Sequence, residues 1–355
     1  MLTMTRPRIC PIGLQLGPRS AMLVQLSGNP GEQEVFQMAQ GEMPFDEHAS
    51  SEVQDREIAA ALRKLIADHH FRGHSVVSCL GSQELFVQNV RLPKLPPEEI
   101  DKVVRWEAEE RLPYPLAEAE IRHLIAAEVR QDANIKQEVI LLACHQGIIK
   151  RHVALLESAG LVPAAIDVEP CAILRCLQAG EIQGKEHRAA YIHLGERSTT
   201  VIFAEGEQIL FLKYISSGGH HLDLAVARHL NLPLPEAAKM RAVVSGSQTL
   251  DNNDEVHRSI IEAIQAPLEA MSTEVGLCLR YYKVTFRGRP IEKFIIIGEE
   301  ASPWMAEFLS SRVGGHCEIG DPFGCLGPGS RAREIDRPGR WATAVGLSLK
   351  ETVLK

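Results

Sequence analysis

The stretch HLGERSTTVI, residues 193–202, decides the fold because it repeats an earlier stretch, QLGPRSAMLV at residues 15–24. Both copies share the core L-G-x-R-S between two runs of strand-forming residues, so each predicts a β-hairpin with glycine at its turn. A unit that recurs in the two halves of a chain indicates a duplicated architecture. The sequence therefore predicts two lobes, each of which opens with the same hairpin.

Length and composition agree with a two-lobed globular protein. The 355 residues are more than one ordinary core holds, and 45% of them are apolar and 24% charged, which is typical of folded domains. The net charge is -8, and Lys and Arg are scattered among the acids. Because no basic stripe follows from this pattern, we expect no nucleic-acid partner and no direct contact with an anionic membrane.

Cysteine usage and the N-terminus indicate where the chain resides. Eight cysteines lie apart without any C-x-x-C spacing, so we expect reduced, mostly buried thiols and no metal site. The N-terminal MLTMTRPRICPIGLQL lacks the apolar centre of a signal peptide, and no apolar run approaches the roughly 18 residues that cross a bilayer. We expect a cytoplasmic protein without direct membrane insertion, whose association with a membrane depends on a partner.

The first lobe is predicted over residues 1–187, with a small α+β insert at about 76–145. Hydrophobic periodicity and turn residues predict its elements. Its strands are expected at 9–16, 20–27, 34–39, 75–80, 84–91, 120–128, 137–144 and 163–168, and its helices at 54–70, 97–111, 147–159 and 170–179.

The second lobe is predicted over residues 188–323. After its hairpin we expect strands at 207–215, 293–297 and 316–319 and helices at 220–230, 235–242 and 303–313. Apolar residues every three or four positions between 255 and 283 predict one long amphipathic helix, or two joined at Pro267. A Gly/Pro-rich connector follows at 324–338. The final segment, 339–355, is expected to return to the first lobe with a helix at 340–352.

Two glycine-turned hairpins and a third glycine turn after a hydrophobic strand are what a nucleotide cleft between two lobes requires. Glycine lets backbone N–H groups approach phosphate oxygens, and a carboxylate at the end of each hairpin would hold Mg²⁺. The candidate residues of this cleft are Gln15, Gly17, Ser20, His193, Gly195, Thr199, Gly218, Gly219 and Gly298.

Several motifs give the sequence a family resemblance. The proline-rich RLPYPL at 111–116, the double glycine at 218–219 and the D-P-F at 321–323 stand in the same order as the two hairpins. Together they resemble the PilM family of type IV pilus assembly proteins, which are actin-like ATPases related to FtsA. The resemblance runs along nearly the whole chain and implies an α/β, two-lobed actin-like ATPase fold with duplicated ribonuclease-H-like lobes.

The chain departs from this family at all three nucleotide loops. The first loop has Gln15 in place of the family's Asp, Pro18 in place of a Ser and Met22 in place of the Lys. In the second loop His193 replaces the Asp, and the adenosine loop reads Gly298–Glu300 with two acids where glycine is usual. Because metal clamping and positioned water carry phosphoryl transfer, we expect a pseudo-ATPase that has no catalytic residues, binds no metal and takes no cofactor.

The resemblance implies a scaffold of a type IV pilus or related secretion platform, peripheral to the inner membrane. In that family the cytoplasmic N-terminal segment of a PilN-type membrane protein binds a groove formed by the first lobe and the insert, and self-association into a ring is a further implied property. Alternatives stay open: a protein that still binds or slowly hydrolyses ATP with Mg²⁺, a kinase of the same fold, or an FtsA-like filament.

Other residues admit a functional and a plain interpretation. His69, His70 and His74, with the pair His220–His221, suggest metal ligands, but surface or helix-end positions explain them without a metal. Asp167 or Glu169 would position water in a residual ATPase, and their role as helix-capping acids is the plainer interpretation. The prolines of RLPYPL fit a partner-docking segment or a plain boundary between a helix and a strand.

Overall fold

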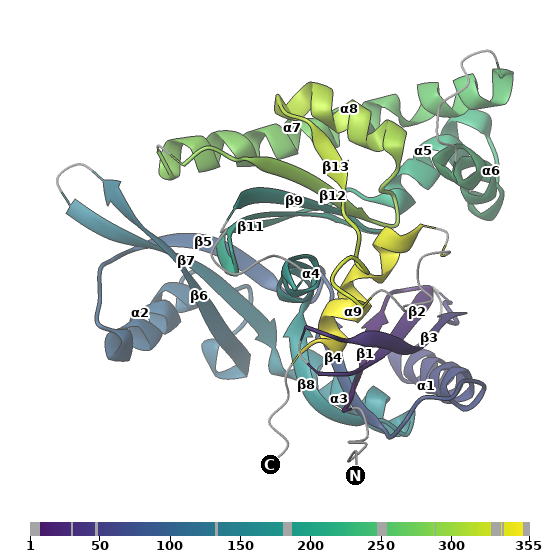
Figure 1. Cartoon of the computed structure of the whole chain (residues 1–355), viewed down its shortest axis with the longest axis horizontal. Coiled ribbons are helices and arrows are strands. Elements are labelled where there is room, and N and C mark those ends of the chain that lie inside the picture. The colour runs from purple at the N-terminus through teal and green to yellow at the C-terminus, as the bar shows by residue number, and fades with distance from the viewer. Residues whose placement is uncertain are drawn as a thin grey trace, which may run out of the picture.

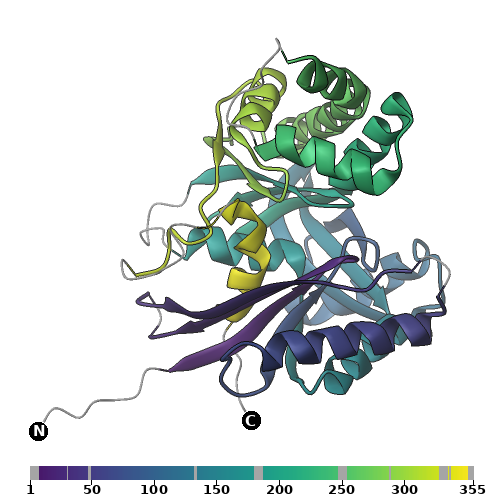
Figure 2. The same ribbon diagram turned by 90° about the vertical axis from the view of Figure 1, so that its right-hand side faces the viewer.

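The structure is a computed structural model that describes residues 8–350 except 30, 47–48, 132–133, 180–186, 247–253, 288, 328–334 and 336. Figures 1 and 2 show two lobes, each built on a sheet, with helices α4 (Glu169–Gln178) and α9 (Ala342–Ser348) between the two sheets. A third, smaller sheet projects from the first lobe. The predicted two-lobed α/β fold with an insert is confirmed.

The first lobe has a five-stranded sheet in the order β3-β2-β1-β4-β8. Its strands are β1 (Ile9–Leu16), β2 (Ser20–Ser27), β3 (Glu34–Glu42), β4 (Ser75–Leu80) and β8 (Val162–Val168). Side chains of β2 alternate between the two faces. Leu23 packs in the same cluster as helices α1 (Ser51–Ala67) and α3 (Gln146–Ser158), whereas Val24 packs in the cluster of α4 and α9.

The second lobe repeats this sheet in the order β11-β10-β9-β12-β13. Its strands are β9 (Arg188–Leu194), β10 (Thr199–Glu205), β11 (Gln208–Ile215), β12 (Lys293–Gly298) and β13 (Cys317–Ile319). In both lobes an antiparallel meander is followed by two parallel strands. The duplication predicted from the repeated hairpin is therefore confirmed at the level of strand order and direction.

Four helices cover the outer face of the second sheet (Figure 1): α5 (Gly219–Leu230), α6 (Leu234–Gly246), α7 (Glu255–Thr285) and α8 (Pro303–Val313). The predicted amphipathic stretch forms one helix, α7, which continues through Pro267. Asp254 caps its start by accepting hydrogen bonds from the backbone of Val256 and His257. Burial of one apolar stripe against the sheet outweighs the backbone hydrogen bond that Pro267 cannot donate.

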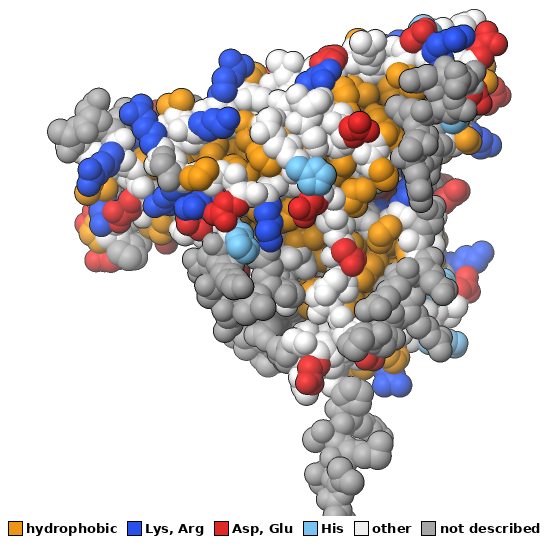
Figure 3. Space-filling model, turned by 45° about the horizontal axis from the view of Figure 1, so that its top comes forward, with side chains coloured by type: hydrophobic (Ala, Val, Ile, Leu, Met, Phe, Trp, Pro, Cys, Tyr) orange, Lys and Arg blue, Asp and Glu red, His pale blue; other side chains and the backbone are white. Residues whose placement is uncertain are grey.

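Charges of both signs are mixed on the face shown in Figure 3. There, Lys and Arg side chains alternate with Asp, Glu and neutral side chains, and apolar atoms fill much of the surface between them. No helix within the described ranges is both long and apolar enough to cross a membrane.

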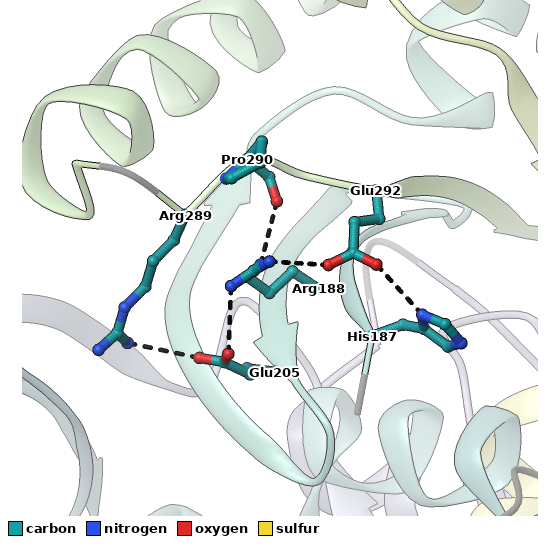
Figure 4. Close-up of polar contacts among 6 residues, drawn as sticks. All are labelled: His187, Arg188, Glu205, Arg289, Pro290 and Glu292. Carbon is teal, nitrogen blue, oxygen red and sulfur yellow. Dashed lines mark hydrogen bonds and ion pairs between the residues drawn. The ribbon is translucent and has the colours of Figure 1, made fainter. Parts of the chain in front are cut away.

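An ion-pair cluster fixes the segment between α7 and β12 to the edge of the sheet (Figure 4). Arg188, the first residue of β9, pairs with Glu292 at 3.0 Å and with Glu205 at 3.5 Å. Arg289 also pairs with Glu205, and His187 contacts the other oxygen of Glu292. Each exposed pair contributes little by itself, but together they join the ends of β9 and β10 to the strand that follows α7.

The insert is a three-stranded sheet in the order β5-β7-β6, with α2 packed on one face. Its elements are β5 (Phe86–Pro93), α2 (Pro97–Glu109), the short 3-10 helix η1 (Leu116–Glu118), β6 (Ala119–Gln131) and β7 (Asn134–His145). The insert begins after Leu80 rather than at residue 76, because Ser75–Leu80 pairs with β1 and β8 inside the first sheet. Five of the six residues of that strand are buried, as a central strand covered on both faces requires.

The C-terminal helix is shorter than predicted and packs closely against the first lobe. It begins after a 3-10 turn, η3 (Pro338–Trp341), and α9 ends at Ser348 instead of 352. A Cβ on Gly13 would overlap the carbonyl of Ala344, so this glycine lets α9 approach β1. Ser348 Oγ donates to Pro11 O at 2.9 Å and accepts from Leu26 N at 3.1 Å, which joins the end of α9 to β1 and β2. Most of the predicted connector, 324–338, and residues 351–355 lie outside the described residues.

Candidate functional site

The two hairpin turns face one cleft between the lobes, and the turns are built alike. Gly17 N donates to Ser20 O at 2.8 Å, and Gly195 N donates to Ser198 O at 3.0 Å. The cleft encloses about 440 Å³. Of the nine predicted site residues, five line it: Gln15, Gly17, Ser20, His193 and Gly195.

The other four predicted residues lie behind the wall of the cleft, where they hold its backbone in place. Thr199 is fully buried and its Oγ1 donates to Ser217 O at 2.8 Å. Gly298 has a φ of +109°, and a Cβ there would overlap the carbonyl of Leu194. Gly218 likewise lies against the carbonyls of the second turn. Glycine is needed at these turns so that segments of the second lobe can approach one another.

The N-terminus of α5, which would be expected to face a phosphate, is already occupied. Gly219 N donates to Gly195 O at 3.0 Å and His220 N donates to Glu196 O at 2.8 Å. Helix N-terminal amides bind anions only when they are free to donate. In this chain the second hairpin turn accepts them.

The adenosine loop holds a buried ion pair that sequence reasoning did not identify. We expected the two acids of this loop to repel a nucleotide, but both oxygens of Glu300 accept from Arg241, at 2.6 and 2.9 Å. Arg241 also pairs with Asp223 at 2.5 Å, and these carboxylates raise its pKa although its burial opposes them. The cluster therefore joins α5, α6 and the loop after β12.

Glu299, the other acid of this loop, does face the cleft. Burial raises its pKa, and the neighbouring charge of Glu196 raises it further. Burial also raises the pKa of Glu196, against the opposing influence of Arg197 and Arg19. Two carboxylates that share a half-closed space make it unfavourable for a further anion.

The floor of the cleft carries a polar contact between the two halves of the chain. Glu169, in the first turn of α4, accepts from Thr200 Oγ1 at 3.1 Å and lies 3.7 Å from His193 Nδ1. Asp167 lies elsewhere: burial tends to raise its pKa, but Arg175 and Lys350 outweigh this and hold it low. Of the two acids considered for water positioning, only Glu169 lines the cleft.

The residues present do not fit ATP with Mg²⁺. Gln15 and His193 are the next-to-last residues of β1 and β9, and neither side chain supplies a carboxylate for the metal. Five carboxylates and three guanidinium groups line the cleft, an excess of negative charge that opposes a polyphosphate. They are Asp55, Glu84, Glu169, Glu196, Glu299, Arg151, Arg197 and Arg340.

The histidines singled out from the sequence lie on helices and loops. His69 Nδ1 contacts Leu65 O at 2.8 Å, and the rings of His220 and His221 pack edge to face. In the part of the chain that the structure describes, no three His, Cys, Asp or Glu side chains are placed to share a metal ion.

A second cavity of about 430 Å³ lies where the insert meets the first lobe. Its walls come from β4, β6, β7, β8 and α3. The lining residues are Leu80, Leu85, Glu120, Arg122, Leu142, Ala143, Cys144, Gln146, Ile149, Lys150, Ile166, Asp167 and Val168. We call this cavity the insert groove.

Comparison with known proteins identifies the family. A family model described as type IV pilus assembly protein PilM matches residues 13–352. The chain is similar to a chain of a solved "PilM-PilN type IV pilus biogenesis complex", with 23% identity, a TM-score of 0.79, and 97% of this chain and 98% of that chain covered. It is also similar to the ethanolamine utilization protein EutJ from Carboxydothermus hydrogenoformans, with 16% identity, a TM-score of 0.54, and 97% and 90% covered. The two-lobed fold is that of the actin-like ATPases, and the chain belongs to the PilM family of type IV pilus assembly proteins.

Proposed function

We propose that this protein is a cytoplasmic scaffold of a type IV pilus or related secretion platform, and that it binds the cytoplasmic N-terminal segment of a PilN-type membrane protein in the insert groove without hydrolysing ATP. The observation that carries the proposal is the groove itself, which lies between the insert and the first lobe in a member of the PilM family. The similar solved complex contains PilM together with PilN. Association with the inner membrane would then come through the partner.

The groove suits an extended peptide. β6 is an outer strand of the insert sheet and β8 is an outer strand of the first-lobe sheet, and residues of both line the groove. An extended segment can hydrogen-bond to such a strand edge while its side chains enter pockets on either side. Apolar side chains such as Leu142 and Ile166 form its walls, and Arg122 and Lys150 project at its rim.

The proposed absence of ATP hydrolysis rests on the contents of the cleft. The helix N-terminus that would receive a phosphate donates to the second hairpin turn, and the adenosine loop is closed by Arg241 and Glu300. A fold can keep its architecture after its original chemistry is lost. The expected self-association into a ring stays a prediction.

The experiment is a titration of the purified protein with a labelled peptide covering the cytoplasmic N-terminus of the PilN-type protein from the same source, followed by fluorescence polarisation. We expect saturable binding. Absence of binding at high micromolar peptide would contradict the proposal.

Two adjacent isoleucines on α3 provide a matched control. Ile149 lines the insert groove and Ile148 lines the cleft, and both are half-buried. Ile149→Glu puts a charge where the peptide would bury apolar surface, so we expect affinity to fall by about tenfold or more. Ile148→Glu should leave affinity unchanged. Equal losses in both variants would indicate that the peptide does not bind in this groove.

A further inference from the structure

The turn of the second hairpin, Glu196–Ser198, contacts the first lobe with consecutive side chains. Ser198 Oγ and Ser82 Oγ are hydrogen-bonded at 2.7 Å across the cleft. The guanidinium of Arg197 lies 5.7 Å from the centre of the Phe45 ring, in the segment that follows β3. The second turn is thereby joined to the segment after β3 in the first lobe and to the loop between β4 and β5, where the insert begins.

The third side chain of this turn reaches the opposite hairpin. Glu196 Oε2 lies 4.0 Å from where a Cβ on Gly17 would be, so the carboxylate stands against the first turn. Both turns also carry an arginine at the same position of the repeat, and Arg19 lies 5.2 Å from the same Phe45 ring. Two guanidinium groups on one ring repel each other unless an anion is near. Glu196 is adjacent to Arg197 in the second turn, and its carboxylate stands against the first turn, which carries Arg19. Burial raises the pKa of Glu196, and the two guanidinium charges oppose this.

We propose that the chain closes its own cleft through an inter-lobe latch formed by Glu196, Arg197 and Ser198. In this latch the Glu196 carboxylate occupies the space between the two turns that a ligand phosphate would need. The lobes then close on a side chain of the protein, and closure needs no nucleotide. The latch rests on the proposed absence of ATP hydrolysis and gives it a structural cause. It does not depend on peptide binding in the insert groove.

Chemical rescue by a small anion tests the latch. Glu196→Ala leaves Arg19 and Arg197 without their anion and opens a space between the two turns, so inorganic phosphate should bind there. We expect phosphate at tens of millimolar to raise the thermal midpoint of this variant by about 2 °C more than that of the wild type. Glu84→Ala is the matched control, because Glu84 lines the same cleft but accepts from Gly81 N within its own loop. Phosphate should raise the thermal midpoint of this control variant no more than that of the wild type.

A second measurement keeps the test decisive if Glu196→Ala does not fold. The double variant Glu196→Gln/Ser82→Ala keeps the side-chain volumes and removes the charge and the cross-cleft hydrogen bond. Small-angle scattering should then give a radius of gyration above that of the wild type, which is about 20 Å for a compact chain of this length. The latch is refuted by equal phosphate shifts in wild type, Glu196→Ala and Glu84→Ala, or by an unchanged radius. The peptide titration is a separate readout, so loss of the latch and loss of the groove are told apart.

Discussion

The cleft between the lobes and the insert groove enclose similar volumes, about 440 and 430 Å³, but their walls differ. In the cleft, polar side chains of opposite walls bond to each other, as Ser82 does to Ser198 and Glu169 to Thr200. In the groove, Arg122 pairs with Glu120 of its own strand, and the exposed Arg122 and Lys150 lie beside apolar lining residues. Hydrogen bonds between opposite sides of a cavity hold two parts of a protein together. A cavity whose opposite sides are not joined in this way can accept a binding partner.

The same contrast explains how a duplicated fold acquires different roles. The two hairpins keep the same glycine turn and the same internal hydrogen bond, so the architecture survives in both lobes. Their neighbours have changed: the second turn accepts the amides of α5 and contacts the first lobe. Among the residues that the structure describes, the second lobe has no third sheet like that of the insert, so the groove beside the insert belongs to the first lobe.

The largest effect should come from breaking the buried cluster beside the cleft. Arg241→Met leaves the buried Glu300 and the half-buried Asp223 without their cation, which should lower the free energy of unfolding by about 3–5 kcal/mol. Urea unfolding followed by circular dichroism measures this. Arg312→Met is the control, because Arg312 pairs with Glu269 on the surface and such an exposed pair contributes little to stability. If Arg241→Met lowers the free energy of unfolding no more than Arg312→Met does, the buried cluster beside the cleft does not stabilise the second lobe.

The next effect compares ligands for the two spaces directly. A PilN-type peptide at about 100 times its dissociation constant adds about 2.7 kcal/mol, which moves the thermal midpoint by roughly 2–4 °C or somewhat less in a longer chain. Millimolar ATP·Mg²⁺ should leave the midpoint unchanged, because the cleft carries excess negative charge and no metal-binding carboxylate at Gln15 or His193. Thermal scans of one preparation with each ligand decide the point. A shift with ATP·Mg²⁺ would mean that the cleft still binds nucleotide.

The sequence predicted the fold well because its strongest signals are local. A glycine turn between two strands, and an apolar residue every three or four positions in α7, depend on neighbours in the chain. The start of the insert was misplaced because the strand Ser75–Leu80 precedes it directly, and only pairing with β1 and β8 assigns it to the first lobe.

The site was less predictable because its decisive contacts are long-range. Gln15 and His193 were located through the hairpin repeat, and both line the cleft. The pairing of Arg241 with Glu300 spans 59 residues and that of Ser82 with Ser198 spans 116, and no local pattern links such partners. Helix α6, which carries Arg241, has no motif that marks this residue.

A smaller effect should come from the serine pair across the cleft. Ser82→Ala and Ser198→Ala each remove the same hydrogen bond, so their double variant should cost less than the sum of the two, with a coupling of about 1 kcal/mol. Ser82→Ala combined with Ser310→Ala should be additive, because Ser310 bonds within α8 and to Cys317. Chemical unfolding of the wild type, the three single serine variants and the two double variants measures the coupling in each pair. If the losses of unfolding free energy from Ser82→Ala and Ser198→Ala are additive, the two hydroxyl groups are not hydrogen-bonded in solution.

The smallest effect is a change in pH dependence at the edge of the cleft. Burial, Glu196 and Glu300 raise the pKa of Glu299, and Arg340 and Arg337 oppose them. A raised pKa means that the folded state favours the protonated carboxyl, so this stabilisation is complete below the usual Glu pKa of about 4.3 and is lost as pH rises. Glu299→Gln should therefore be more stable than the wild type at pH 7, and the difference should vanish in acid.

Replacing Glu292, which lies outside the cleft, should change stability at pH 7 in the opposite direction. A hydrogen bond from His187 and the charge of Arg188 lower its pKa, so its charged form stabilises the fold above pH 4.3 and that contribution is lost as pH falls. Glu292→Gln should be less stable than the wild type at pH 7 and equal to it in acid. Urea midpoints from pH 8 down to about pH 3, below the usual Glu pKa, measure both variants. If the two midpoints shift in the same direction at pH 7, Glu299 is paired in solution like a surface carboxylate, and the cleft does not carry the excess charge that separates it from the groove.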